Sequence, residues 1–252
     1  MGQGKKEEIF LENSIAQVYR LKISKAFWDK MQTGKITEKL IAGKLGLAIG
    51  TDFFSDTETG HKLLKGIDIG RWKIKSNRWL KNKQKLKWKQ VEAFLKPKII
   101  AQRLVAHIEN PVPHIKITAC YDREGIIMTN TLMSFELDER IFPEFWLAYL
   151  NSSFVSWYGY NFIYARAIRG MDLYNFYIQQ IPIPRNIFEQ RVQDKFIKIV
   201  SDIENIVSSS NYKTNIEKQT QVKEYEKQID QTVYGLYDLT EDEIKIIEGK
   251  DA

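Results

Sequence analysis

The sequence predicts an α+β fold with a β-rich part followed by a helical part, and three observations lead to this prediction. Before residue 185, short apolar runs with polar neighbours are separated by glycine and proline. After residue 186, apolar residues recur every three or four positions, which is the spacing of one helix face. Between them lies Ile181-Pro182-Ile183-Pro184, where each proline keeps the preceding residue out of the α region. We therefore expect one domain over residues 1–185 and a second over residues 186–252.

The elements of the β-rich part are predicted from its turns and its alternating residues. Residues 7–48 contain helix-like patches and turns marked by glycine. Residues 96–104 predict a strand that is entered through a proline. Apolar and polar residues alternate over 115–119, and residues 122–125 predict a turn. We therefore expect residues 126–132 to return as the second strand of a hairpin.

A helix is predicted inside this part, over residues 143–158, because apolar residues recur at helical spacing from Leu147 to Trp157. The surrounding stretch, residues 145–165, carries no charge for 21 residues, which is long enough to cross a bilayer. Asparagine, serine and glycine interrupt it, and four tyrosines are spread through it. The composition favours a buried helix followed by a strand or loop over a membrane span.

The C-terminal part predicts an antiparallel helical hairpin. Residues 192–206 and 222–236 each carry one apolar stripe, and residues 208–211 (SSSN) interrupt the pattern between them. Thr240 and Glu243 have the spacing of a capping box, which predicts a short last helix. Two helices alone bury too little apolar surface to be stable. We therefore expect the stripes to dock on the β-rich part, on another domain or on a second copy.

The charge distribution is uneven. The chain has a net charge of +6, and residues 71–90 contain nine Lys or Arg, three Trp and no acid. Residues 186–252 contain nine basic and fourteen acidic side chains, a balance of −5, so residues 1–185 carry +11. An ordinary solvated face mixes the two signs, whereas a basic stripe with interleaved aromatics suits a polyanion. Both interpretations of the stripe remain open from the sequence, as do anchoring and base stacking for its tryptophans.

The sequence lacks the motifs of common active sites. No nucleophilic triad, P-loop or H-E-x-x-H motif occurs, and the single cysteine, Cys120, excludes a disulfide within one chain. Cys120 and the nearby His107 and His114 lie among apolar neighbours, so we expect no metal site there. Glu243 and Lys245 match half of a nuclease motif, but the capping box already explains Glu243. The amino terminus lacks an apolar signal segment, which favours an intracellular protein.

Five short blocks, in order and with consistent spacing, carry a family resemblance. They are residues 64–72 (LKGIDIGRW), 96–103 (KPKIIAQR), 149–152 (YLNS), 181–184 (IPIP) and 229–244 (IDQTVYGLYDLTEDEI). Together they resemble the TaqI-like C-terminal specificity domain of adenine-specific DNA methyltransferases and of fused type IIG restriction–modification enzymes. The resemblance covers roughly residues 45–248.

The resemblance implies a fold and a role. The fold is a β-rich recognition part, winding somewhat like a double β-helix, followed by an α-helical hairpin. The role is to read double-stranded DNA so that a separate amino-terminal domain, with or without a fused nuclease, methylates an adenine at N6. The cofactor glycine motif and the Asn-Pro-Pro-aromatic loop of that catalytic domain are absent from this sequence. S-adenosylmethionine is therefore expected on the catalytic domain and no cofactor on this chain, which we expect in the cytoplasm of a bacterium or archaeon.

Two alternatives to this interpretation remain. In the first alternative, the chain is a half-size specificity subunit of a multi-subunit restriction–modification system, and the hairpin is a spacer. In the second, it is a complete enzyme whose site the motifs do not show. The mass of the native particle separates the first alternative from a monomeric recognition domain. Methyl transfer from labelled S-adenosylmethionine tests the second.

Eleven residues are the candidates for DNA contact. Lys and Arg of the basic stripe are expected to bind phosphates without reading sequence, whereas an arginine fork can bridge the two acceptors of guanine. For each arginine outside the stripe, a surface ion pair is an equally good explanation. The phosphate candidates are Arg71, Lys73, Lys75, Arg78 and Lys81; the base-reading candidates are Arg103, Arg123, Arg166 and Arg169; Trp72 and Lys98 complete the set.

Overall fold

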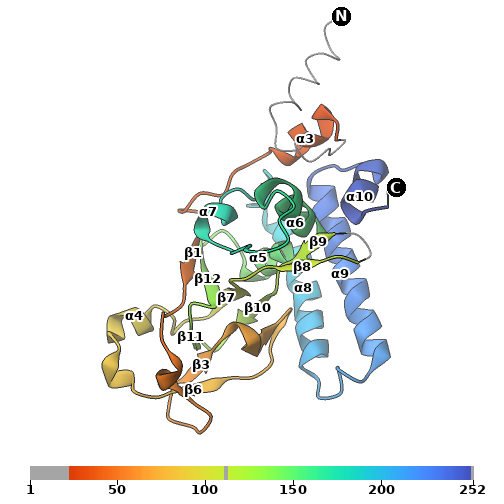
Figure 1. Cartoon of the computed structure of the whole chain (residues 1–252). Helices are drawn as coiled ribbons and strands as arrows, with labels where there is room; N and C mark the ends of the chain where they lie inside the picture. Colours follow the sequence, from red (N-terminus) through yellow and green to blue (C-terminus); the bar gives the residue numbers. More distant parts are fainter. Residues whose placement is uncertain (1–22, 111–112, 251–252) are drawn as a thin grey trace, which may run out of the picture.

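The computed structural model describes residues 23–110 and 113–250. Its β-rich part contains two four-stranded sheets and two small hairpins (Figure 1). The first sheet is antiparallel, in the order β1 (Ile41–Leu45), β12 (Leu132–Leu137), β7 (Lys98–Gln102) and β10 (Ala119–Asp122). The second has the order β11 (Ile127–Met128), β3 (Lys62–Leu64), β6 (Arg78–Leu80) and β2 (Phe54–Ser55). The hairpins are β4 (Ile69–Gly70) with β5 (Lys73–Ile74), and β8 (Ala106–Ile108) with β9 (His114–Lys116).

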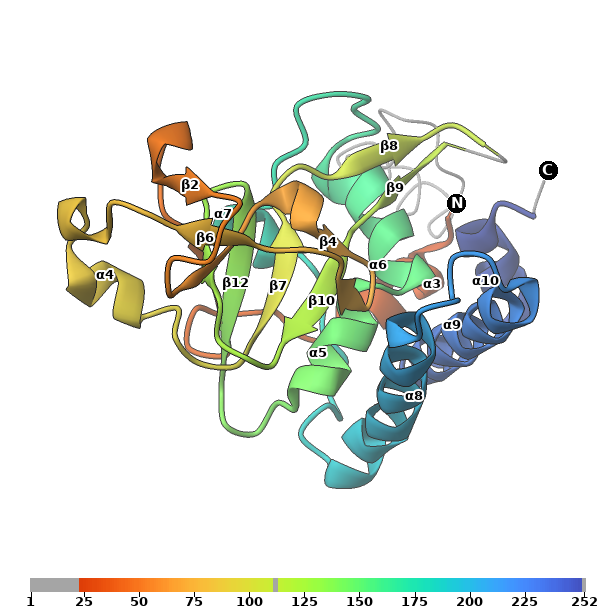
Figure 2. The same ribbon diagram turned by 90° about the horizontal axis from the view of Figure 1, so that it is seen from below.

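The helices lie around and beside these sheets (Figures 1 and 2). α3 precedes the first sheet, α4 lies at the end of the molecule farthest from the C-terminal hairpin, and α5 packs against β7 and β10. The helices are α3 (Lys25–Met31), α4 (Trp88–Glu92), α5 (Pro143–Leu150), α6 (Ser153–Tyr158), α7 (Asn175–Ile178), α8 (Gln190–Ser208), α9 (Ile216–Leu236) and α10 (Glu241–Glu248). Three 3₁₀ turns cover Thr51–Phe53, Gly66–Asp68 and Lys83–Lys85, and a π-helix covers Gly159–Ile163.

The first sheet separates two clusters of buried side chains. Successive side chains of a strand point to opposite faces. Ile99 and Ala101 of β7 accordingly join the large cluster with α5, whereas Ile100 joins a smaller cluster with Leu64 and Ile69. The predicted strand at residues 96–104 is therefore confirmed as β7, and it is buried on both faces.

The C-terminal hairpin docks on α5 and α6. α8 and α9 run antiparallel, and α8 presents Phe196 to the ring of Phe145, with 5.3 Å between the ring centroids. The hydroxyl groups of Tyr149 and Tyr237 are 2.6 Å apart in the interior. The large core cluster contains side chains from both sides of residue 185, so the apolar stripes face the β-rich part, one of the three docking partners expected. The capping box of Thr240 and Glu243 is confirmed at the start of α10.

The predicted hairpin over residues 115–132 is wrong. The turn exists, since Asp122 accepts hydrogen bonds from the backbone N–H groups of Gly125 (3.0 Å) and Ile126 (2.7 Å). After the turn, however, the chain leaves the first sheet, and β11 pairs in parallel with β3 of the second sheet. Residues on both faces of such a strand are buried, so its apolar residues do not show which partner it takes.

The predicted helix over residues 143–158 is interrupted at Asn151, and α5 and α6 are separate helices. The Asn151 side chain bonds the backbone of Ala119, accepting from its N–H at 3.3 Å and donating to its carbonyl at 3.2 Å. Ser152 then caps α6 by accepting the N–H of Val155. The polar residues in this uncharged stretch thus have structural partners. Across the residues that the structure describes, no helix is long and apolar enough to cross a membrane.

Candidate nucleic-acid interface

The acid-free basic segment, residues 71–90, crosses the β-rich part from end to end. It begins in the turn between β4 and β5, continues through β6 and ends in α4. Its first residues contact the C-terminal hairpin, while α4 lies at the opposite end of the molecule (Figures 1 and 2). The two ends of the segment therefore have different surroundings.

The first cations of the segment are held by the protein itself. Arg71 Nη2 donates to the carbonyl of Asn151 and lies 3.2 Å from Glu226 Oε1 on α9. Lys73 Nζ donates to the carbonyl of Val207 near the end of α8. Both side chains join the β4–β5 hairpin to the C-terminal helices, and part of the Arg71 charge is already neutralised by Glu226.

Trp72 anchors this hairpin. Its side chain is 3% exposed, and its Nε1–H donates to Glu226 Oε1 at 2.8 Å. Its backbone has the unusual φ of 69°, which the hydrogen bond from its N–H to the carbonyl of Ala119 helps to maintain. The indole is not available to stack on a base, so the structure favours anchoring over stacking for Trp72.

The middle of the segment carries one paired and one unpaired cation. Arg78 Nη1 lies 3.3 Å from Asp56, and its Nε lies 3.8 Å from the buried Asp68. Lys75 is exposed, and no described residue forms a hydrogen bond or ion pair with it. Exposed ion pairs are weak, so Arg78 can exchange Asp56 for a phosphate at small cost.

The last third of the segment is a cluster of exposed lysines, which we call the distal lysines: Lys81, Lys83, Lys85, Lys87 and Lys89. Within the described residues, only Lys85 of this cluster has a carboxylate nearby, Asp52 at 3.6 Å. Trp88 lies among them, 37% exposed, with its ring centroid 5.0 Å from that of His61. Uncompensated lysines around a partly exposed aromatic ring form a surface suited to a phosphate backbone.

Lys98 does not have the exposure that a DNA contact requires. It is 5% exposed, and its ammonium donates to the carboxylate of Asp122 and to the carbonyls of Phe94 (2.7 Å) and Ile126 (3.0 Å). Burial lowers the pKa of Lys98, and the charge of Asp122 opposes this shift. The prediction that Lys98 contacts DNA is contradicted by this burial, because the side chain instead holds the turn after β10.

Two of the four base-reading candidates are held in ion pairs. Arg103 Nε lies 3.0 Å from Asp172 Oδ1, and both side chains are about one quarter exposed, at 26% and 25%. Arg123 Nη2 lies 2.7 Å from Glu204 on α8 and 3.3 Å from Glu144 on α5. Burial raises the pKa of Glu204, and the hydrogen bond from Arg123 opposes this rise. Arg123 therefore connects two helices.

The other two candidates lie in the loop after the π-helix. Arg166 is exposed, and its Nε donates to Asn161 Oδ1 at 2.9 Å. Arg169 is exposed, and no described residue forms a hydrogen bond or ion pair with it. Gly170 follows it with φ of 72°, a conformation that glycine adopts without strain. Of the four arginines, Arg169 is the one whose fork is unoccupied in the described structure.

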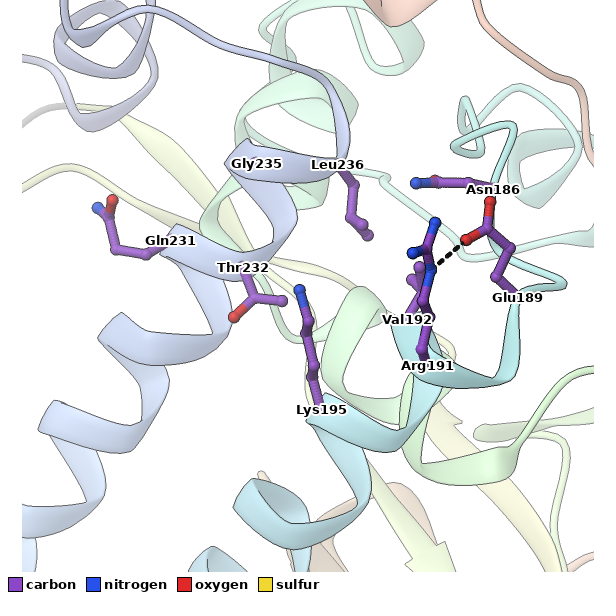
Figure 3. A pocket seen from close by; sticks show the side chains of 9 residues that line it. All are labelled: Asn186, Glu189, Arg191, Val192, Lys195, Gln231, Thr232, Gly235 and Leu236. Carbon is purple, nitrogen blue, oxygen red and sulfur yellow. Dashed lines mark hydrogen bonds and ion pairs between the residues drawn. The ribbon is translucent and has the colours of Figure 1, made fainter.

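A hollow lies between the start of α8 and the end of α9 (Figure 3). Its volume is about 510 Å³, and it holds none of the DNA-contact candidates. Glu189 and Arg191 pair across 2.7 Å at its edge, so its charge is mixed. The lining residues are Asn186, Glu189, Arg191, Val192, Lys195, Gln231, Thr232, Gly235 and Leu236. They contain no nucleophile with an adjacent base.

The described residues also contain no group of three or more His, Cys, Asp or Glu side chains able to hold a metal ion. Cys120 is buried, and burial raises the pKa of its thiol. The rings of His107 and Tyr160 are tilted against each other, with 5.7 Å between their centroids.

Sequence reasoning missed two lysines that share a hollow with Arg71. Lys116 lies on β9 and Lys227 on α9. Neither belongs to a basic run, and Lys227 lies in the acidic part of the chain. The fold of the β-rich part brings Lys116, and the docking of the hairpin brings Lys227, into the same hollow as the start of the basic segment. No local pattern in the sequence indicates either lysine.

Comparisons with known proteins agree with the architecture. Residues 61–183 match the family described as the TaqI-like C-terminal specificity domain. The matched range contains three of the five blocks and most of the fourth, residues 181–184, and it ends before the fifth, residues 229–244. No protein among the curated sequences matches the chain.

Solved structures give a likeness of fold. The type IIL restriction–modification enzyme MmeI, solved in complex with DNA, aligns with a TM-score of 0.52 and 10% identity, over 86% of this chain and 35% of its own. A type I restriction–modification assembly aligns at 0.43 with 12% identity (98% of this chain, 58% of that chain). The HsdS subunit from Thermoanaerobacter tengcongensis aligns at 0.28 with 15% identity (98% and 55%). The chain thus spans about a third of the MmeI chain.

The family match, the two packed sheets with their C-terminal helices, and the likeness of fold to MmeI agree with one another. Residues 61–183 are accordingly similar to the TaqI-like C-terminal specificity domain family.

Proposed function

We propose that the chain is the DNA target-recognition domain of a type II, IIG-like restriction–modification adenine-N6 methyltransferase. It reads a sequence in double-stranded DNA and positions a separate amino-terminal methyltransferase domain, which binds S-adenosylmethionine. The observation that best supports this proposal is the basic segment within a specificity-domain fold. Its distal lysines are exposed, and most of them have no carboxylate nearby among the described residues. We place this activity in the cytoplasm of a bacterium or archaeon.

The exposure and pairing of the candidate side chains support a division into phosphate contacts and base contacts. Lys75, Lys81, Lys83, Lys87 and Lys89 are exposed cations without a partner among the described residues, and they supply the phosphate contacts. Five such contacts give a log–log salt slope of roughly −4.5, since each contributes about −0.9. Arg169, with its fork unoccupied, supplies a base-edge contact, to which Arg103 can add if its pairing with Asp172 is exchanged.

The test measures binding of labelled duplexes by fluorescence anisotropy across a range of salt concentrations. A preferred sequence is first selected from a random duplex library with the wild-type chain. Lys81→Ala should weaken binding to every duplex alike and make the salt slope shallower by about one unit. Arg169→Ala should cost about 1–3 kcal/mol on the selected sequence and little on a scrambled one. Lys198→Ala, at an exposed position of α8, is the matched control.

Three results would contradict the proposal. A wild-type slope near zero, or no duplex binding at low salt, would show that the basic segment does not bind DNA. Equal losses for Arg169→Ala on both duplexes would make that arginine a phosphate contact. Methyl groups transferred from labelled S-adenosylmethionine to DNA by this chain alone would show that it is a complete enzyme.

A half-size specificity subunit of a multi-subunit system is the second candidate. The observation that favours it lies on the C-terminal hairpin, where Ile197 (37% exposed) and Ile216 (78% exposed) remain outside the core. Such a subunit needs a partner or a second copy along its helices. A concentration-dependent mass above that of one chain, reduced by Ile216→Lys, would favour this candidate, whereas a monomer at all concentrations favours the recognition domain of a fused enzyme.

A further inference from the structure

A second hollow lies where the β-rich part meets the C-terminal hairpin. Its volume is about 670 Å³, and it lies between β9, α6, α9 and α10, next to the first residue of the basic segment, Arg71. The distal lysines take no part in it, since they are at the other end of that segment. This hollow is therefore a second basic surface, which we call the proximal groove.

The lining of the proximal groove is predominantly cationic. Arg71, Lys116, Arg166, Lys227 and Lys250 line it, and Glu248 is the one carboxylate among the described lining residues. Glu248 is already paired with Lys250 at 2.5 Å. Glu226, close to the groove, accepts from Trp72 and pairs with Arg71. Lys227 pairs with Glu224 at 3.6 Å. These acids are thus paired, and the lining itself, with five cations and one carboxylate, keeps an excess of positive charge.

Two cationic groups in the groove lack an acceptor. Lys116 has no hydrogen bond or ion pair to any described residue. Burial lowers the pKa of Lys116, the Arg71 charge lowers it further, and Glu226 only partly opposes this. Arg71 Nε is buried and finds no acceptor within the described structure, although Nη2 is fixed by Asn151 and Glu226. A buried donor without an acceptor is costly, and an anion beside it would remove that cost.

The walls of the groove strengthen its attraction for an anion. Trp157 and Tyr160, 7% and 8% exposed, supply apolar surface beside the cations, together with Ile115. Charges interact more strongly beside apolar surface than in open water. The guanidinium of Arg71 is preorganised, so little side-chain freedom is lost when it binds an oxyanion.

We infer that the proximal groove is a phosphate-binding site, held by Lys116 and Arg71 with Lys227 at its rim. This assignment of the phosphate to the DNA backbone rests on the proposed function. DNA would then contact the protein at both ends of the basic segment. A mononucleotide has the same phosphate chemistry and is the other source to be distinguished.

The test uses the full chain and three variants at two positions. Lys116→Gln removes the charge, Lys116→Arg keeps it, and Lys198→Gln removes the same charge from an exposed site on α8 outside the groove. Melting temperatures show whether each variant folds like the wild type. Each is titrated with a scrambled duplex across several salt concentrations, and separately with adenosine 5′-monophosphate by calorimetry.

For a backbone site, Lys116→Gln should make the salt slope shallower by about 0.9, so that the ratio of wild-type to variant affinity changes about three- to four-fold between 50 and 200 mM salt. Lys116→Arg and Lys198→Gln should keep the wild-type salt slope. Lys198→Gln should lower the affinity only slightly, and by the same factor at every salt concentration. Saturable nucleotide binding that Lys116→Gln abolishes, with an unchanged DNA slope, would assign the site to a small phosphorylated ligand.

If Lys116→Gln changes neither titration while the wild type binds DNA, the inference is overturned and the proposed function stands. If Lys198→Gln lowers the slope as much as Lys116→Gln, the effect is one of overall charge and the inference is equally overturned. If the wild type binds no DNA, the proposed function fails, and the nucleotide titration alone decides whether the groove binds phosphate.

Discussion

Replacing Lys98 with alanine tests whether this residue holds the fold or grips DNA. The substitution removes the ammonium from Asp122, whose side chain is 0% exposed, and leaves the carbonyls of Phe94 and Ile126 without their donor. Breaking a buried ion pair by removing one partner costs about 3–5 kcal/mol, because a buried charge remains uncompensated. For a chain of this size, such a loss lowers the melting temperature by roughly 6–20 °C.

The assay is chemical denaturation followed by tryptophan fluorescence, with DNA binding measured at a temperature where the variant is folded. Lys96→Ala is the control, since that side chain is 61% exposed and 3.6 Å from Glu136, and its loss should change the free energy of unfolding by less than about 0.5 kcal/mol. We expect Lys98→Ala to lose stability and keep the wild-type salt slope. An unchanged free energy of unfolding together with a shallower slope would refute the structural role.

Two further substitutions test the packing of the C-terminal hairpin. Ile203→Asp, at a fully buried position of α8, should cost several kcal/mol in thermal unfolding, while Ile197→Asp, 37% exposed on the same helix, should cost little; similar melting temperatures would show that the stripe is not buried. Burial raises the pKa of Asp230 from 3.8 to about 6, opposed by hydrogen bonds from Ser153. The folded state therefore binds a proton on Asp230 more tightly than the unfolded state does. The stabilisation from this proton is fully present below about pH 4 and is lost as the pH rises through 6, which lowers the free energy of unfolding by about 3 kcal/mol. Asp230→Asn should remove this part of the pH dependence, and an unchanged pH profile would contradict it.

Much of the fold could be predicted because its signals are local. The helical stripes, the capping box at Thr240 and the strand at β7 follow from spacing along the chain, and all are confirmed. The pairing of β11 could not be predicted, since its partner β3 is far away in sequence and both faces of β11 are buried. The break at Asn151 likewise depends on the backbone of Ala119, a contact that no pattern in the sequence reveals.

The candidate site divides in the same way. Composition alone reveals the basic segment, and its distal lysines are exposed as a phosphate contact requires. Composition does not distinguish Lys98 or Trp72, which are buried, from their exposed neighbours. Lys116 on β9 and Lys227 on the docked hairpin share a hollow with Arg71 only in the folded chain, so neither could be found from the sequence.

The contacts of Glu226 with Trp72 and Arg71 have a consequence for how DNA would approach. Glu226 on α9 partly neutralises Arg71 at one end of the basic segment, whereas the distal lysines at the other end have almost no acidic partners among the described residues. Positive charge is therefore distributed more unevenly over the molecule than its net charge of +6 suggests. Under the proposed function, a duplex arriving by diffusion meets the distal lysines first and is turned towards the hairpin afterwards. Under the same proposal, the C-terminal helices contribute to recognition by limiting where DNA can bind.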